Sequence, residues 1–159
     1  MLKGYFGEAS AQIHYRHWPA KNHAGHPPLI MLPPAPHSGK FFETACAKMN
    51  AFTDIYAVDY PGYGGSDALP VPATIEGYAN ALLPFIQQFG KVTLAGFHTG
   101  NLVAIELASK HPALIGQMVL IDIPYFDHVT AEKYAASLGA DGVPDDIKAA
   151  FDKSVKGDD

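Results

Sequence analysis

The chain has 159 residues, of which 48% are hydrophobic and 17% charged, with a formal net charge of −5. This composition is typical of a globular domain and excludes an intrinsically disordered chain. The acidic balance gives no electrostatic attraction to nucleic acid or to an anionic membrane, so we expect neither as a partner. The single cysteine, Cys46, excludes an internal disulfide, and no apolar run approaches the ~20 residues of a membrane span. We therefore expect a cytoplasmic protein.

Strands and helices are expected to alternate along most of the chain. Alternating apolar residues predict a hairpin of strands over 3–6 and 11–18. Short apolar runs predict buried strands over 29–32, 53–58, 92–95 and 118–123. Helical patterns cover 38–50, 74–89 and 102–110, with weaker ones over 130–138 and 145–156. This order predicts an α/β fold, a mostly parallel twisted sheet with helices on both faces that stops after about six strands.

One strand–turn–helix stands out in this series. The apolar run over 92–95 leads into Gly96-Phe97-His98-Thr99-Gly100, and a helical pattern follows at once. The spacing is that of a nucleophile elbow, a tight turn that holds its central residue at positive φ and needs glycine two residues to either side. The central residue here is His98, which stands where a serine, cysteine or aspartate nucleophile is usual.

Three motifs in this order resemble the α/β-hydrolase fold superfamily. The superfamily's His-Gly-x-Pro loop corresponds to Pro-Pro-Ala-Pro at 33–36, its Asp-x-x-Gly-x-Gly-x-Ser segment to 59–66, and its elbow to 96–100. The resemblance implies a hydrolase-like core over 1–127 and a helical tail over 128–159 that starts a cap region. We find no counterpart of the strands that carry the superfamily's acid and histidine, so we expect a truncated sheet.

The resemblance also implies roles for individual residues. The backbone N–H groups of Ala35 and Thr99 would form an oxyanion hole. His98 would act as nucleophile or as general base, because imidazole has a pKa of about 6.5 and is partly neutral at pH 7; the alternative is that it only lines a pocket. Asp122 would orient His98; the alternative is an ordinary turn aspartate.

Further residues are expected around the substrate or in the framework of the site. The predicted lining comprises His37, Phe97, Tyr125, Tyr60, Tyr63 and Phe126. Ser38 has a second interpretation, as the cap of the helix that follows it. Asp59 is expected to tie down the turn at Pro61-Gly62 through local backbone hydrogen bonds.

We expect no metal and no cofactor. His14 and His17 are three residues apart on a predicted strand and would point to opposite faces of the sheet. His23 and His26 have no cysteine or carboxylate close by in sequence. The glycines over 62–65 lack the strand and helix that flank a dinucleotide-binding motif. Cys46 lies in an apolar helical pattern and is expected in the core.

The sequence leaves two functional hypotheses open. The first is a hydrolase of a small ester, lactone or related carbonyl substrate, with the atypical His98 at the nucleophile position. The second is a catalytically silent hydrolase-like protein that binds a small apolar ligand or a protein partner. The strand predicted over 118–123 would be an apolar sheet edge, which invites pairing with another strand. We therefore expect either part of a longer hydrolase or a homodimer that forms through this edge.

Overall fold

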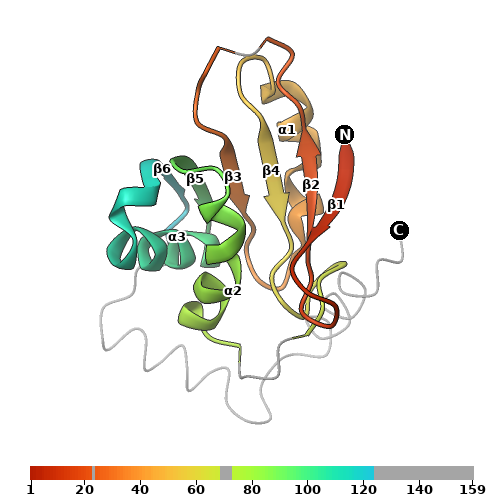
Figure 1. Ribbon diagram of the computed structural model, residues 1–159, viewed down its shortest axis with the longest axis vertical. Helices are drawn as coiled ribbons and strands as arrows, with labels where there is room; N and C mark the ends of the chain where they lie inside the picture. The colour runs from red at the N-terminus through yellow and green to blue at the C-terminus, as the bar shows by residue number, and fades with distance from the viewer. Residues whose placement is uncertain (23, 69–72, 124–159) are drawn as a thin grey trace.

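The structure, a computed structural model, describes residues 1–22, 24–68 and 73–123. Within these residues, six strands form one sheet in the order β1-β2-β4-β3-β5-β6 (Figure 1). The strands are β1 (Leu2–Phe6), β2 (Ile13–Trp18), β3 (Leu29–Leu32), β4 (Ile55–Val58), β5 (Val92–Phe97) and β6 (Ile115–Ile121). The pairs β1–β2 and β2–β4 are antiparallel, and the other pairs are parallel. The predicted mostly parallel α/β sheet is therefore confirmed.

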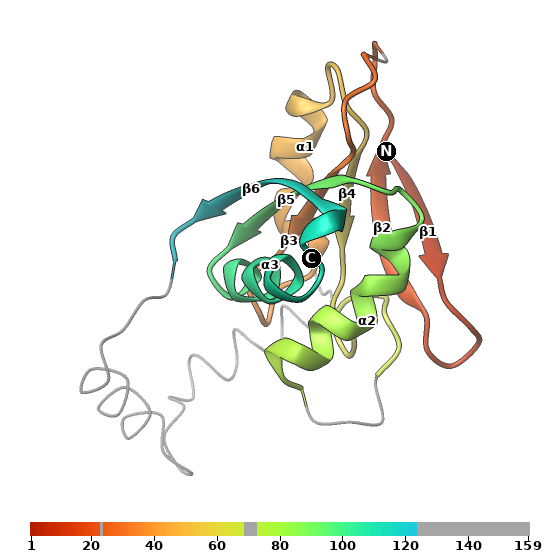
Figure 2. The same ribbon diagram turned by 60° about the vertical axis from the view of Figure 1, so that its left-hand side comes forward.

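Helices cover both faces of this sheet. Figure 2 shows α1 (Glu43–Met49) on one face and α2 (Ile75–Gln87) and α3 (Thr99–Lys110) on the other. Two short 3₁₀ helices, η1 (Gly39–Phe42) and η2 (Pro112–Leu114), precede α1 and β6. The Thr74 hydroxyl caps α2 by accepting a hydrogen bond from the Gly77 N–H at 2.9 Å, as expected of a residue at this position. Among the described residues, no helix is both long enough and apolar enough to cross a lipid bilayer.

Two apolar cores follow from the alternation of side chains along the central strands. Ile30 and Leu32 of β3 face α2 and α3, whereas Met31 between them faces α1. The same alternation on β5 sends Leu94 to the larger core and Ala95 to the smaller one. The carboxyl ends of the parallel strands β3, β4 and β5 therefore lie side by side, and ligands of parallel sheets bind beyond these ends.

Some predicted boundaries were wrong. The helix predicted over 38–50 is the 3₁₀ helix η1 followed by the short α1, and Ser38 caps η1 by accepting from the Lys40 N–H at 3.3 Å. The last strand begins three residues earlier than predicted, because Ile115 already pairs with Val92 of β5. The helices predicted over 130–138 and 145–156 and the tail over 128–159 lie outside the described residues.

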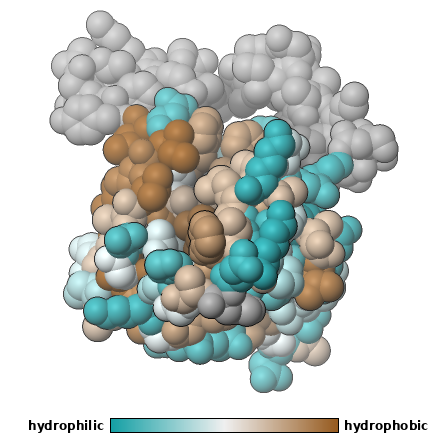
Figure 3. Space-filling model, turned by 90° about the horizontal axis from the view of Figure 1, so that it is seen from above, coloured by the Kyte–Doolittle hydropathy of each residue, from teal (hydrophilic) through white to brown (hydrophobic). Residues whose placement is uncertain are grey.

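The edge strand β6 exposes apolar side chains. Met118, Val119 and Ile121 are 41–49% exposed, as is Ile123 just after the strand. Hydrophobic residues gather on the left of the molecule when it is seen from above, the side on which β6 lies (Figure 3). The sequence between Ile115 and Ile121 contains no charged residue and no proline, the two features that commonly protect a sheet edge from pairing.

Candidate active site

The predicted elbow is present between β5 and α3. His98 follows directly on the last residue of β5, precedes the first residue of α3, and has φ 50° and ψ −113°. This backbone conformation is rare for a residue with a side chain and costs about 1–3 kcal/mol, so it persists only where the surrounding structure enforces it. The His98 side chain is exposed. The turn therefore holds an imidazole outward at the carboxyl end of a central strand.

Close packing of backbone enforces this turn. A Cβ on Gly96 would lie 2.6 Å from the Asn101 nitrogen, and a Cβ on Gly100 would overlap the carbonyl oxygen of Leu32 at the end of β3. Glycine is thus required at both positions for steric reasons. The contact of Gly100 with Leu32 also brings the first turn of α3 against the point where the 33–38 loop leaves β3.

The elbow is fastened to β6 by hydrogen bonds. The His98 N–H donates to the Ile121 carbonyl at 3.1 Å. The buried side chain of Asn101 donates to the same carbonyl at 2.8 Å and accepts from the Ile121 N–H at 3.1 Å. Sequence reasoning missed Asn101, although an asparagine on the buried side of an otherwise apolar helix is a recognisable signal.

The two backbone donors predicted for the oxyanion hole belong to the turn after β5 and to the loop after β3. Thr99 is the first residue of α3, so its N–H belongs to the helix terminus, which lacks intrahelical partners and carries partial positive charge. The N–H of Ala35 has no acceptor among the described residues. The Thr99 hydroxyl lies 3.4 Å from Nδ1 of His98.

An aromatic contact links the predicted lining residues His37 and Phe97. The Phe41 ring lies 5.5 Å from that of His37 and 5.2 Å from that of Phe97, measured between centroids. Phe41 is 45% exposed and belongs to η1, directly after the 33–38 loop. Phe41 was not among the predicted lining residues, and only the fold brings it to the elbow.

Asp122 lies beside the elbow through its backbone. It follows Ile121, whose carbonyl binds His98, and it has a positive φ of 53°. Its side chain is exposed and makes no hydrogen bond to His98 in the described part of the chain. Tyr125 lies outside the described residues. Tyr60, expected in the lining, is instead fully buried and stacks on Tyr78 at 4.8 Å.

Asp59 has a wider role than the local turn predicted for it. Its carboxylate accepts the Gly65 N–H at 2.9 Å, within that turn, and also the Gly39 N–H at 2.6 Å. Nδ1 of His14 and the guanidinium of Arg16 each lie 2.8 Å from it. Burial would raise the pKa of this carboxyl, but these hydrogen bonds and the charge of Arg16 outweigh burial, so the pKa lies below its usual value.

The strand histidines each bind a carboxylate. His14 binds Asp59, and Nε2 of His17 lies 3.0 Å from Asp54 at the other end of β4. His17 also stacks on Tyr56 with ring centroids 4.2 Å apart. In the described residues, no three histidine, cysteine or carboxylate side chains gather in a group that would hold a metal ion.

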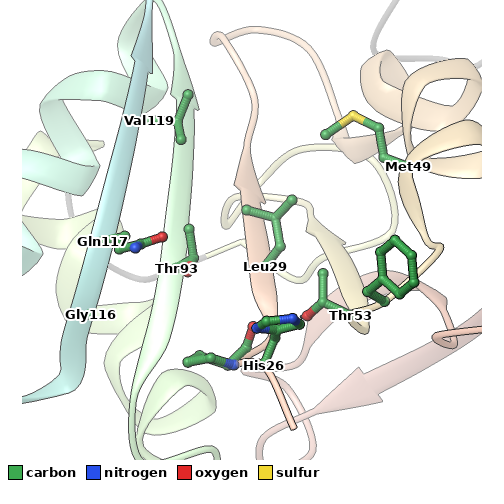
Figure 4. Close-up of a pocket in the computed structure, with 10 residues that line it drawn as sticks. His26, Leu29, Met49, Thr53, Thr93, Gly116, Gln117 and Val119 are labelled. Carbon is green, nitrogen blue, oxygen red and sulfur yellow. The ribbon is translucent and has the colours of Figure 1, made fainter. Parts of the chain in front are cut away.

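A hollow on the α1 face of the sheet lies away from the elbow. It has a volume of about 550 Å³. Figure 4 shows Leu29, Thr93 and Val119 extending into it from β3, β5 and β6, with Met49 across from them. Leu29 and Thr93 are at the amino ends of their strands, whereas His98 follows a carboxyl end. The hollow is therefore distinct from the candidate active site.

Comparisons with known proteins agree with this architecture. No protein-family model matches the chain. A pimeloyl-[acyl-carrier protein] methyl ester esterase of Aromatoleum aromaticum is 38% identical over 61 residues, which make up 38% of this chain and 23% of the esterase. Among solved structures, the chain is similar to an α/β hydrolase from Novosphingobium aromaticivorans, with 21% identity and a TM-score of 0.73.

Two further structures show the same likeness. A thermophilic esterase from Thermogutta terrifontis is 18% identical with a TM-score of 0.64, and the match covers 84% of this chain and 50% of the esterase. An N-acyl homoserine lactonase complexed with N-butanoyl homoserine is 20% identical with a TM-score of 0.69. The match covers 99% of this chain and 71% of the lactonase. The match to the Novosphingobium hydrolase covers 87% of this chain and 50% of that hydrolase.

These likenesses show that the fold is the α/β-hydrolase fold. The chain spans 23% of the curated esterase and about half of two of the three structures.

Proposed function

We propose that this chain carries the elbow half of a hydrolase for a small ester, lactone or related carbonyl compound, with His98 as its catalytic residue. The observation that carries the proposal is the conformation of His98, φ 50° and ψ −113° at the junction of β5 and α3. A strained backbone at a solvent-facing turn is typical of functional positions. The similarity to an esterase and a lactonase supports the substrate class.

In this proposal His98 activates a water molecule. The imidazole takes a proton from the water, and the resulting hydroxide attacks the carbonyl carbon. The N–H groups of Ala35 and Thr99 hold the oxyanion of the tetrahedral intermediate. Collapse of the intermediate breaks the bond to the leaving alkoxide, which takes the proton back from the imidazolium. Asp122 follows β6 beside the elbow and is the proposed group that orients His98.

Direct attack by the imidazole is the other route for the same residue. It would form an acyl-imidazole and release the alcohol, and water would then hydrolyse the acyl group. The two routes differ in a measurable way. An acyl adduct on His98 would appear in the mass spectrum of protein quenched during turnover, whereas general-base catalysis leaves the protein mass unchanged.

A silent binding protein is the second candidate function. It is favoured by one observation: no carboxylate among the described residues makes a hydrogen bond to His98. In this alternative the elbow histidine and the aromatic side chains of Phe41 and Phe97 hold an apolar ligand without turnover.

Turnover of short chromogenic esters and lactones distinguishes the two candidates. The test compares wild type, His98→Ala and His98→Ser with the matched control His111→Ala, which alters a histidine at the opposite end of α3. Loss of turnover in His98→Ala alone would support the hydrolase. Activity in none of the four proteins, together with ligand binding that depends on His98, would support the binding protein. Activity only in His98→Ser would show an intact site that lacks its nucleophile.

A further inference from the structure

Asp59 joins two loops that are far apart in sequence. Its Oδ1 accepts from the Gly39 N–H, directly after the 33–38 loop, and its Oδ2 accepts from the Gly65 N–H of the 59–67 turn. Arg16 binds Oδ1 and His14 binds Oδ2 from the neighbouring strand β2. All four donors converge on one fully buried carboxylate.

Glycines let the backbone of both loops approach this carboxylate and its surroundings closely. A Cβ on Gly64 would overlap Oδ2 of Asp59 and lie 2.8 Å from the Ser38 side chain, so the two loops touch. A Cβ on Gly39 would lie 2.7 Å from the Ala57 carbonyl oxygen, and one on Gly65 would lie 2.9 Å from the ring of His14. Backbone packed this closely has little room to move.

We infer that Asp59 is a positioning residue, which fixes the 33–38 loop against the sheet and thereby sets the place of the Ala35 N–H beside the elbow. The part of this inference that concerns the oxyanion rests on the proposed function. The structural part does not, because it concerns only how Asp59 couples the two loops. An oxyanion donor acts only when it is held in advance at the position where charge develops, and the 33–38 loop has one end in β3 and the other at Gly39.

The matched control for Asp59 is Asp54. The two aspartates flank β4, and each binds a histidine of β2, Asp59 with His14 and Asp54 with His17. Asp54 lies at the amino end of the strand, away from the elbow. Changing either one to asparagine removes one negative charge next to β4, but only Asp59→Asn places an N–H₂ group against the donors of the two loops.

Amide hydrogen exchange measured by NMR on the 159-residue chain tests the coupling. In Asp59→Asn we expect amide exchange at Gly39 and Gly65 to rise at least about tenfold, because asparagine offers one acceptor oxygen where the carboxylate offers two. We also expect shifted resonances for Ala35 and His37. In Asp54→Asn these amides should match wild type. Unchanged exchange at Gly39 in folded Asp59→Asn would overturn the inference.

Turnover of the ester panel tests the consequence for catalysis. We expect kcat to fall at least about tenfold in Asp59→Asn with KM within about twofold, because the donor acts in the transition state, and no change in Asp54→Asn. Absence of turnover in wild type would contradict the proposed function while the exchange result still decides the coupling. Equal kcat in wild type and Asp59→Asn would overturn the positioning role.

His14→Gln keeps the inference testable if Asp59→Asn does not fold. It removes one donor and leaves the carboxylate and both loop N–H groups in place. Because one side chain serves both loops, exchange should rise at Gly65 and also at Gly39. A rise confined to Gly65 would show that the loops are independent and would overturn the inference.

Discussion

The side-chain amide of Asn101 pairs with both backbone polar groups of Ile121. Nδ2 donates to the carbonyl at 2.8 Å, and Oδ1 accepts from the N–H at 3.1 Å. The asparagine is fully buried, and the same carbonyl also accepts the His98 N–H. One side chain thus completes the hydrogen bonding of α3, the elbow and β6 at the place where they meet.

Replacing Asn101 with alanine should be strongly destabilising. The substitution leaves the Ile121 N–H without its partner and removes one of two donors to the carbonyl. Ile121 is partly exposed, and one unsatisfied polar group costs about 1–3 kcal/mol, so we expect the free energy of unfolding to fall by about 1–3 kcal/mol. Urea unfolding measures this loss. Ser109→Ala, an exposed change on the same helix, should stay within about 0.5 kcal/mol of wild type. An equal, small effect of both substitutions would contradict the role of Asn101.

A methyl group at Gly100 should separate α3 from β3. The Cβ would overlap the backbone oxygen of Leu32, and backbone atoms give way less easily than a flexible side chain. We expect Gly100→Ala to lower the free energy of unfolding by about 3 kcal/mol, at the upper end of overpacking effects. Gly116→Ala is the control, because its Cβ would lie 3.5 Å from the nearest backbone oxygen, an ordinary contact. Thermal unfolding of both variants checks the prediction, which fails if Gly100→Ala is tolerated as well as Gly116→Ala.

Acid should weaken the fold through Asp59. Despite its burial, this carboxyl has a pKa below its ordinary 3.8, because hydrogen bonds from His14 and the two glycine N–H groups, with the charge of Arg16, favour the ionised form. A group with a lowered folded-state pKa contributes stability that is present above its unfolded pKa and lost as pH falls through the folded pKa.

We therefore expect the free energy of unfolding to decline below about pH 4, and to decline less in Asp59→Asn. Urea titrations between pH 7 and pH 3 give both curves. Glu76 also has a lowered pKa, through Lys110, but it contributes equally to both proteins, so their difference reports Asp59. Parallel curves for the two proteins would contradict the prediction.

We propose that the exposed edge of β6 pairs with β6 of a second copy. The strand is uncharged and apolar, and antiparallel pairing of one such strand with itself brings identical apolar rows together. Light scattering should then give a dimer mass that falls to the monomer mass on dilution. Val119→Lys should give a monomer at all concentrations. Ile105→Lys, a similarly exposed change on α3, should leave the dimer intact. A monomeric wild type would exclude this pairing.

Local patterns in the sequence predicted much of the fold. The strand 29–32 and the glycines of the elbow both appear as expected, because each is marked by a short pattern of neighbouring residues. Buried Cys46 was also predicted, from the apolar helix around it. The start of β6 was missed because Gly116 and Gln117 interrupt its apolar pattern, and pairing with β5 decides where the strand begins.

The connections of the site were beyond such patterns. The partners of Asp59 lie 43 and 45 residues away at Arg16 and His14, and Asn101 reaches Ile121 across 20 residues. Nothing local in the sequence distinguishes Asp59 from an ordinary turn aspartate. Such contacts depend on which strands become neighbours, so they follow only from the assembled sheet.

The two carboxylates that flank β4 also bear on the register in which β4 pairs with β2. Asp54 holds His17 and Asp59 holds His14, so β2 and β4 are joined at both ends. A slip of two residues between β2 and β4 would keep apolar side chains on the same faces of the sheet, so hydrophobic burial alone would not disfavour it. It would, however, part both histidine–carboxylate pairs at once and leave a buried charge without a counterion. The two pairs therefore favour the observed register of β2 against β4 over such a slip.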